Sequence, residues 1–372
     1  MLTLVASLLS APLLLHEPFT PNVASPKTTP VPMRRGRAEL ASVGALAFGP
    51  KGVLFAADPR AAELYALDTE EVLLGSSAPE LRNASSAIAA LLGTTTRDIT
   101  IQDLAVHPET GTAYLSVLRG NGPDALPIIL RVGEDGQLEE FPLENVPHAV
   151  VGISNAPQDR ASGGRNRRLE SITDLLYQDG KVLIAGLSNE EFASKLRAID
   201  YPFAMDGEVA SGASVEIYHG AHGAWETRAP VRTFAPFEID GESHLLAAYT
   251  CTPLVKFPMS VFASKQKVVG HTVAELGGGN APLDMEVYEQ DGERFLLITN
   301  SRRGVMKVST AGIEKIDAIT ERVSGVTAGL TYETVDYLVG VEQMAKLDDR
   351  SFVVLMKDKA AKEPSLLTIE AP

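Results

Sequence analysis

Three aspartates stand in similar surroundings at widely separated places in this 372-residue chain. They occur in Ile101-Gln102-Asp103-Leu104, in Ile172-Thr173-Asp174-Leu175 and in Pro282-Leu283-Asp284-Met285, and Glu342 is a candidate fourth member. Carboxylates that converge on one place repel each other unless a cation or hydrogen-bond donors neutralise them, and a hard ion such as calcium suits them. We therefore predict a metal site made by Asp103, Asp174, Asp284 and Glu342, with calcium as the candidate cofactor. The alternative is that each aspartate accepts hydrogen bonds from main-chain amides of the next repeat.

Histidine and cysteine offer a second kind of chemistry. His219 and His222 lie near Trp225 in a glycine-rich turn, where they would either ligate a metal or form a polar surface turn. Cys251 is the single cysteine, so an intrachain disulfide, a cysteine-rich zinc site and c-type haem attachment are all excluded. Its thiol is either a nucleophile or a small buried apolar group.

Arginines gather in a stretch rich in glycine and serine that spans residues 155–168. Such a stretch is either a mobile surface loop or a clamp for an anionic ligand. The arginines concerned are Arg160, Arg165, Arg167 and Arg168.

Several function classes lack their sequence signals. A Gly-x-Ser-x-Gly elbow does not occur, so a conventional serine esterase is unsupported, and no glycine-rich phosphate-binding motif is present. The net charge is −15, and an acidic surface repels a phosphate backbone, so we expect no nucleic-acid partner. An aromatic content of 6% argues against a quinone-carrying redox protein.

The elements that must position these residues form a repeat. A buried apolar strand, a polar loop and a second apolar strand recur six times at intervals of about 50 to 70 residues, a spacing typical of repeat architectures. Turn signals such as Gln178-Asp179-Gly180 precede most copies. The first strand of each copy is apolar at consecutive positions, as expected of a strand packed between two sheets. The strand pairs begin at Val53 and Glu63, Ala113 and Pro127, Val182 (leading into an insertion), Leu245 and Leu254, Phe295 and Val305, and Phe352 and Leu366.

This pattern predicts an all-β fold, a six-bladed β-propeller with short helical insertions, over residues 38–372. A seventh blade would require residues 312–337 to form their own sheet. We expect residues 37–41 to complete the last blade, and helices from Glu80 to Leu92 and from Ser188 to Leu196. Ser188 with Glu191 matches a capping box.

The loops that follow the second strand of each blade should share a face with the acid-bearing first strands. These loops carry amides and arginines that would bind a small polar ligand or a protein partner. The residues chosen as ligand-binding are Asp58, Arg119, Asn189, Asn300 and Arg302.

The N-terminus indicates export. Residues 1–16 form an apolar, signal-like segment that is too short to span a bilayer, and residues 17–37 form a linker rich in proline and threonine. We expect a secreted or periplasmic, monomeric protein without an integral membrane span in its mature form.

The six strand pairs and Asp103, Asp174 and Asp284 make the chain resemble six-bladed propellers of the calcium-dependent phosphotriesterase type, which includes the NHL and SMP-30/gluconolactonase-like groups. The resemblance implies an axial divalent ion held by carboxylate and amide side chains. Two hypotheses follow: an exported binding or scaffold propeller that recognises a ligand on its loop face, or a calcium-dependent hydrolase of a lactone or phosphoester.

Overall fold

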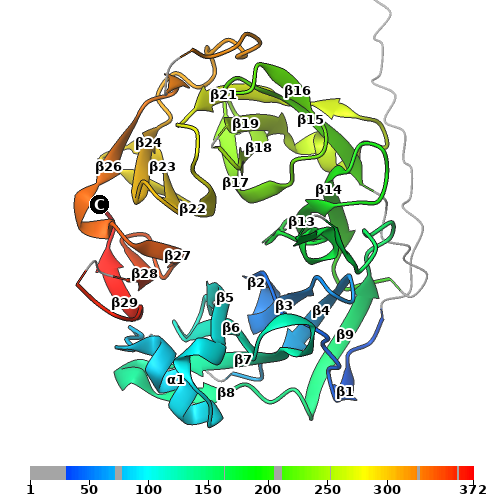
Figure 1. Cartoon of the computed structure of the whole chain (residues 1–372), viewed down its shortest axis with the longest axis vertical. Helices are drawn as coiled ribbons and strands as arrows, with labels where there is room; N and C mark the ends of the chain where they lie inside the picture. Colours follow the sequence, from blue (N-terminus) through cyan, green and yellow to red (C-terminus); the bar gives the residue numbers. More distant parts are fainter. Residues whose placement is uncertain are drawn as a thin grey trace, which may run out of the picture.

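The computed structural model describes residues 31–71, 78–162, 164–204, 212–251, 253–324, 327–357 and 360–372. The predicted signal-like segment and most of the predicted linker lie outside these residues. Six sheets surround a central axis (Figure 1), and one further two-stranded hairpin pairs with none of them. The predicted all-β, six-bladed propeller is confirmed.

The first strand of every predicted copy is the second strand of a blade, and in five copies the predicted partner strand pairs with it. The six adjacent pairs are β3 (Val53–Asp58) with β4 (Glu63–Asp68), β6 (Ala113–Arg119) with β7 (Leu126–Val132), β13 (Lys181–Leu187) with β14 (Ser194–Asp200), β18 (Glu242–Tyr249) with β19 (Pro253–Pro258), β23 (Glu293–Asn300) with β24 (Val305–Ser309), and β28 (Ser351–Met356) with β29 (Ser365–Glu370). Strand β14, the partner in the copy at Val182, was not predicted, and in the last blade along the chain the second member of the pair is the outer edge.

We number the blades by the sequence order of their innermost strands. Blades 1 to 6 have as innermost strands β2 (Leu46–Phe48), β5 (Ile99–Val106), β12 (Asp174–Gln178), β17 (Val231–Ile239), β22 (Pro282–Gln290) and β27 (Val341–Lys346). Further out lie β9 (Val146–Gly152) and β1 (Arg34–Gly36) in blade 1, β8 (Leu138–Glu140) in blade 2, β15 (Ala213–His219), β16 (Ala224–Glu226) and β20 (Val268–Val269) in blade 3, β21 (His271–Glu275) and β25 (Ala328–Gly329) in blade 4, and β26 (Tyr332–Val335) in blade 5.

The order of blades around the ring departs from the order in the sequence. Strand β2 contacts both β5 and β12, whereas β27 contacts both β5 and β22 (Figure 1). The ring therefore runs through blades 2, 1, 3, 4, 5 and 6 before it returns to blade 2. The chain builds most of blade 1, moves to blade 2, and then returns to blade 1 with β9, which pairs with β4.

Ring closure also differs from the prediction. Residues 37–41 do not complete the last blade; Ala38 N instead donates to Leu143 O at 2.8 Å. The outer edge of blade 6 is met by Leu81, which bridges Leu366 of β29. Strand β1, at Arg34–Gly36, pairs with β9 in blade 1, so the propeller begins before the predicted boundary at residue 38. The prediction failed because nothing local in the sequence marks a strand whose partner is far along the chain.

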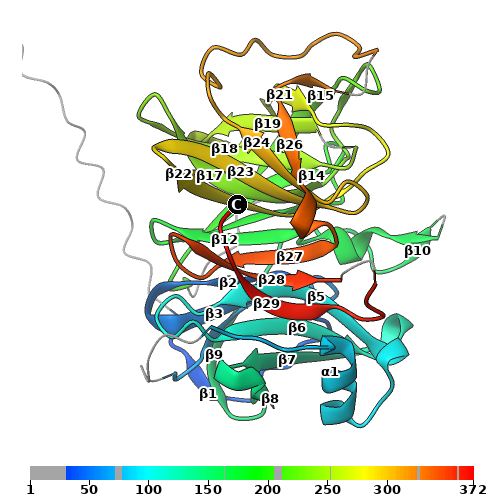
Figure 2. The same ribbon diagram turned by 90° about the vertical axis from the view of Figure 1, so that its left-hand side faces the viewer.

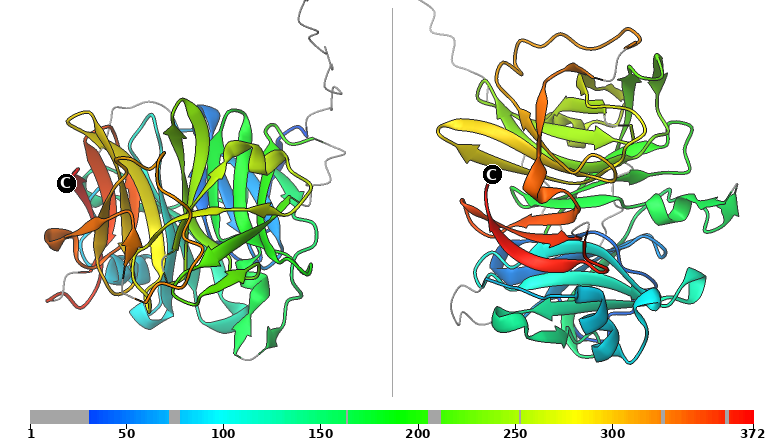
Figure 3. Two further views of the ribbon diagram at one scale, coloured as in Figure 1. Left: turned by 90° about the horizontal axis from the view of Figure 1, so that it is seen from above. Right: turned by 60° about the vertical axis from the view of Figure 1, so that its left-hand side comes forward.

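Residues 312–337 do not build a seventh blade. Strand β25 joins β21 in blade 4 and β26 joins β24 in blade 5. Between β24 and β25 the chain runs along the outer rim, where Ile319 N donates to Thr272 O and Val323 N donates to Gly220 O (Figure 3). We call residues 310–324 the rim strap.

Of the two predicted helices, one is present. Helix α1 (Ala84–Leu92) ends at Gly93, whose φ of 61° gives the left-handed cap expected of glycine. The predicted helix from Ser188 to Leu196 is wrong. Its residues form a hairpin loop closed by Ser188 N to Ala193 O and then strand β14, because Leu196 pairs with Ala185 and joins the alternating pattern of the sheet.

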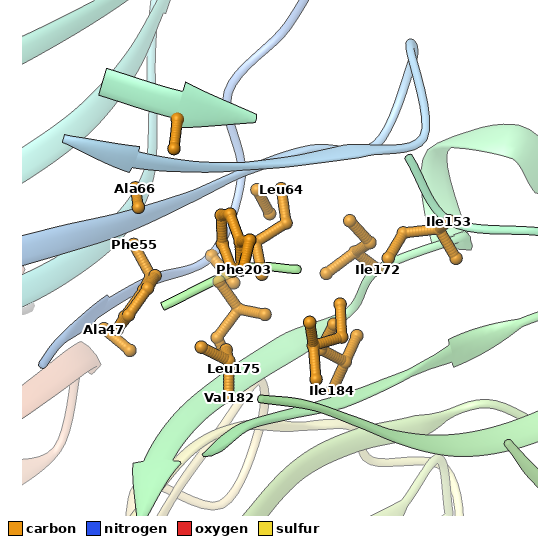
Figure 4. Packing of buried hydrophobic residues seen from close by; sticks show 14 of the residues in the cluster. Ala47, Phe55, Leu64, Ala66, Ile153, Ile172, Leu175, Val182, Ile184 and Phe203 are labelled. Carbon is orange, nitrogen blue, oxygen red and sulfur yellow. The ribbon is translucent and has the colours of Figure 1, made fainter. Parts of the chain in front are cut away.

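Apolar packing between neighbouring blades holds the ring together. Figure 4 shows the cluster between blades 1 and 3, in which Phe203 lies between Phe55 of β3 on one side and Val182 and Ile184 of β13 on the other. Residues 54–58 of β3 are completely buried, because sheets cover both faces of this strand. This environment explains why the repeat is apolar at consecutive positions.

Candidate functional site

The three predicted aspartates converge on the axis. Asp103 of β5, Asp174 of β12 and Asp284 of β22 line one central cavity of about 210 Å³. They come from blades 2, 3 and 5, which alternate around the ring with blades 1, 4 and 6. Glu342 does not line this cavity: its side chain is exposed, and its main-chain carbonyl accepts a hydrogen bond from Thr299.

Each aspartate ties its blade to the next one around the ring. Asp103 Oδ2 accepts from Leu46 N at 2.7 Å, Asp174 Oδ2 from Phe234 N at 2.9 Å, and Asp284 Oδ2 from Met344 N at 2.8 Å. The structural alternative considered for these acids, hydrogen bonding to main-chain amides of the neighbouring repeat, is confirmed.

Hydroxyl groups strengthen the same three junctions. Ser116 Oγ donates to Gly44 O at 2.7 Å, Thr173 Oγ1 to Val231 O at 2.7 Å, and Thr299 Oγ1 to Glu342 O at 3.1 Å. Blades 2 and 1, 3 and 4, and 5 and 6 are therefore each joined by an aspartate–amide and a hydroxyl–carbonyl hydrogen bond. At the junction of blades 5 and 6, Glu286 Oε1 also accepts from Lys346 N at 3.3 Å. The residues that precede the three amide donors are Ala45, Thr233 and Gln343.

The axial cavity disfavours negative charge. Burial, followed by the charge of Asp284, raises the pKa of Asp103 well above its usual range. Burial raises the pKa of Asp174 to about 7, that of Asp284 to about 7 and that of Glu286 to about 8. Gln343 lies between two of these acids: turned to face them, its amide nitrogen is 3.0 Å from Asp103 Oδ1 and 3.2 Å from Asp284 Oδ2.

The five predicted ligand-binding residues do not share one site. Asp58 is completely buried and accepts from Ala41 N, Ser42 Oγ and Ala61 N, so it anchors the N-terminal segment. Asn300 is 5% exposed and bonded to Asn280, and Arg302 lies exposed in the following turn. Arg119 lines a groove between blades 1 and 2, and Asn189 lines a larger pocket beside blade 3.

This larger pocket measures about 970 Å³ and contains the predicted arginine clamp. We call it the arginine pocket. The hairpin of β10 (Ala161–Ser162) and β11 (Arg165–Asn166) projects from the body of the propeller and forms one wall (Figure 2). The loop between β13 and β14 forms another. The charged and amide-bearing residues that line the arginine pocket are Gln158, Arg160, Arg165, Arg167, Glu170, Asn189, Glu190, Glu191 and Arg228.

Arg168, which was predicted together with the other arginines, does not line the pocket but holds main-chain segments beside it in place. Its guanidinium donates to the carbonyls of Arg60, Ala61 and Pro157 at 2.8–3.0 Å, which fixes the base of the hairpin to blade 1. Sequence analysis missed Arg228, because it lies far along the chain from the cluster. The fold brings it close: Arg167 Nη2 donates to Arg228 O at 3.3 Å, a contact across 61 residues.

A buried cation lies near the pocket. Arg197 of β14 is 0% exposed, and its Nη2 donates to the carbonyl of Leu187, a pocket residue, at 3.4 Å. Among the described residues, neither Nε nor Nη1 of Arg197 has a hydrogen-bond partner. Burial lowers the pKa of Arg197 to about 10, which leaves it charged at neutral pH.

No family model matches this chain, and no curated protein matches it. Solved structures with similarity to it include the PQQ-bound aldose sugar dehydrogenase from Streptomyces coelicolor (10% identity, TM-score 0.36, covering 93% of this chain and 99% of that one). A putative oxidoreductase (glucose dehydrogenase) from Thermus thermophilus has 14% identity and a TM-score of 0.38, covering 91% and 100%. The β-propeller domain of Swd1 from Myceliophthora thermophila has 10% identity and a TM-score of 0.37, covering 89% and 84%. Likenesses this distant assign no activity to this chain.

In the described parts of the chain, no helix has the length and apolar character needed to cross a membrane.

Proposed function

We propose that this protein is an exported binding propeller that takes a small, polar, anionic ligand into the arginine pocket. One observation carries the proposal: four arginine side chains line a single pocket in a chain whose net charge is −15. A local reversal of charge on an acidic protein favours binding of an anion there. Export is proposed from the apolar N-terminal segment.

The acids in the pocket are largely neutralised by cations of their own. Glu170 is paired with Arg165 and, at 3.4 Å, with Arg232. Glu190 is paired with the buried Lys195 and accepts from Asn155 Nδ2 at 2.7 Å. The remaining arginines, Arg160, Arg167 and Arg228, are exposed and outnumber the single remaining acid, Glu191. Guanidinium groups suit carboxylate and phosphate ligands because they donate two parallel hydrogen bonds.

The test is calorimetric titration with citrate and with inorganic phosphate as probes. We expect at least one probe to bind the wild type, and the double variant Arg160→Gln/Arg228→Gln to bind it at least tenfold more weakly. This expectation follows because each charge-assisted hydrogen bond contributes on the order of 1.5–3 kcal/mol. Affinity should also fall with added salt.

Arg131→Gln is the matched control, since Arg131 pairs with Glu139 at 3.0 Å on blade 2, outside the pocket. Equal affinity in the double variant and the control, or no binding of either anion at millimolar concentration, would contradict the proposal.

A second candidate function is a calcium-dependent hydrolase of the lactonase or phosphoesterase type. It is favoured by one observation, the convergence of Asp103, Asp174 and Asp284 on a single cavity. The geometry sets a condition on it. Among the described residues, the carboxylate oxygens of these three aspartates are not gathered within 4.8 Å of one another. Calcium would therefore have to draw the three aspartates together.

Calcium titration into metal-depleted protein separates the two functions. If the arginine pocket is the functional site, the melting temperature should not change with millimolar calcium, because the aspartates already accept main-chain hydrogen bonds. If the hydrolase is correct, one calcium ion binds per chain, the melting temperature rises, and Asp103→Ala or Asp174→Ala abolishes both the binding and the hydrolysis of a lactone or phosphoester.

A further inference from the structure

Two histidines and the cysteine meet at the outer junction of blades 3 and 4. One potential ligand atom from each of His219, His222 and Cys251 lies within 4.8 Å of the other two. In the part of the chain that the structure describes, no other three histidine, cysteine or acidic side chains gather so closely. The cluster shares no residue with the axial cavity or the arginine pocket.

A tight turn brings the two histidines together. His219 ends β15, and its carbonyl accepts from His222 N at 3.1 Å and from Gly223 N at 2.8 Å, so the chain reverses into β16. The two imidazole rings lie with their centroids 3.8 Å apart. Glu226 of β16 contacts both, with Oε1 at 3.1 Å from Nδ1 of His219 and 2.6 Å from Nδ1 of His222.

Blade 4 supplies the cysteine and a further acid. Strands β18 and β21 run in the same direction, so Cys251, just after β18, and Glu275, at the end of β21, reach the same face. Cys251 has a left-handed backbone with φ of 66°, a conformation uncommon for cysteine, and its N donates to Asn280 O at 2.7 Å. Glu275 Oε1 accepts from Gly220 N at 2.5 Å, within the histidine turn.

Buried polar atoms in this cluster lack hydrogen bonds. His219 is 2% exposed, and within the described structure neither of its ring nitrogens makes a hydrogen bond; the contact of Nδ1 with Glu226 lacks hydrogen-bond geometry. Glu275 is 1% exposed, and its Oε2 has no partner either. Buried polar atoms are nearly always satisfied, and leaving one without a partner costs about 1–3 kcal/mol. A bound cation would satisfy the histidine and offset the acid.

We propose that His219, His222 and Cys251 bind one divalent transition-metal ion of the zinc class. Two imidazoles and a thiolate are borderline-to-soft ligands, which suit zinc and not calcium or magnesium. Glu226 makes a hydrogen bond with Nδ1 of His222 and lies beside Nδ1 of His219, so Nε2 of each ring is left for the metal and the carboxylate orients His222. Metal–nitrogen and metal–sulfur distances of about 2.0–2.3 Å separate the ligand atoms by about 3.5 Å, so small side-chain rotations complete the site.

The metal has two consequences for the molecule. It crosslinks blades 3 and 4 at their outer ends, where the rim strap also meets the histidine turn through Val323 N and Gly220 O. It also has a fourth coordination position open to water or a small ligand, because the cluster supplies only three protein ligands. Solvent can reach this position because the His222 side chain is 53% exposed.

The experiment uses the full chain, reduced, stripped of metal and held without oxygen, with Co²⁺ as a spectroscopic substitute for Zn²⁺. We expect one Co²⁺ per chain and a thiolate-to-cobalt charge-transfer band that Zn²⁺ displaces. Cys251→Ser should remove the band, and His222→Ala should weaken Co²⁺ binding at least tenfold. Glu226→Gln, which changes a positioning residue, should weaken binding while the band and the stoichiometry stay.

His244→Ala is the control, since His244 lies on β18 outside the cluster and its Nδ1 makes a hydrogen bond with the Glu242 carbonyl at 2.9 Å. Circular dichroism confirms that each variant is folded. The proposal is overturned if folded wild type binds less than one Co²⁺ per chain, or if His222→Ala binds Co²⁺ as tightly as His244→Ala does.

Discussion

Asp284→Asn is expected to stabilise the protein at pH 8 and to leave its stability nearly unchanged at pH 5. Burial raises the pKa of Asp284 from 3.8 to about 7, so ionisation is more costly in the folded chain than in the unfolded one. Below about pH 3 the carboxyl is largely neutral in both states and imposes little penalty. As the pH rises from 4 to 7 the unfolded state loses its proton first, so the free energy of unfolding falls.

The size of this change follows from the shift. One pKa unit corresponds to about 1.4 kcal/mol, so the penalty for Asp284 reaches at most about 4 kcal/mol at pH 8. Asparagine avoids the penalty but gives up one of the two main-chain hydrogen bonds, from Met285 N and Met344 N, which costs about 1–2 kcal/mol. The net gain at pH 8 is therefore about 2 kcal/mol. At pH 5 the unfolded carboxyl is already ionised while the folded one is not, so the penalty is about 1.6 kcal/mol and the gain and the loss nearly cancel.

Urea unfolding in calcium-free buffer at pH 5 and pH 8 measures both values. Asp200→Asn is the control: Asp200 is largely exposed, pairs with Lys181 and should change little at either pH. A destabilisation by Asp284→Asn that is equal at the two pH values would contradict the expectation and would mean that the axial acids are already neutralised, as by a bound cation.

Gly186→Ala is expected to lower the free energy of unfolding by about 3 kcal/mol or more. Gly186 lies in β13, two residues before Ser188 of the arginine pocket. A methyl group there would stand 2.0 Å from the carbonyl oxygen of Ser171 and 2.6 Å from its carbonyl carbon. These are main-chain atoms, so relief requires the entry to blade 3 to move away from β13. Thermal unfolding measures the effect.

Gly152→Ala provides the comparison. Gly152 ends β9, and an added methyl group would meet nothing within 4 Å. Its substitution should alter the melting temperature by no more than a degree or two, in the range of ordinary surface changes. Similar losses in both glycine variants would show that the close approach at Ser171 does not limit the packing.

Local pattern was sufficient to predict the blades. Each central strand is apolar at consecutive positions because it lies between two sheets, and turn residues mark its start, so six copies were recognisable without knowledge of their partners. The same logic placed Asp103, Asp174 and Asp284 on the axis, since innermost strands share it. The prediction failed at Glu342, whose side chain does not face the axial cavity. In blade 6 the next residue, Gln343, faces the axial acids, and Met344 after it donates its amide to Asp284.

Contacts between distant parts of the chain could not be predicted. The chain returns from blade 2 to blade 1 because β9 pairs with β4, a partner far back in the sequence. The arginine pocket likewise forms because the fold brings Arg228 beside Arg160 and Arg165. The histidine turn was recognised as a candidate metal site, but Cys251 joins it only because blade 4 packs against blade 3. Such groupings depend on tertiary structure, which a single sequence does not display.

The return of β9 to blade 1 bears on how the polypeptide emerges from the ribosome. Strands β1 to β4 of blade 1 are synthesised before blade 2, yet β9, which pairs with both β1 and β4, is not complete until Gly152 has been translated. Blade 2 then stays exposed on the side of blade 6 until the C-terminal strands appear, since Leu81 must wait for Leu366. A nascent chain that lacks β29 cannot form this bridge, so closure of the ring has to follow the synthesis of all six blades.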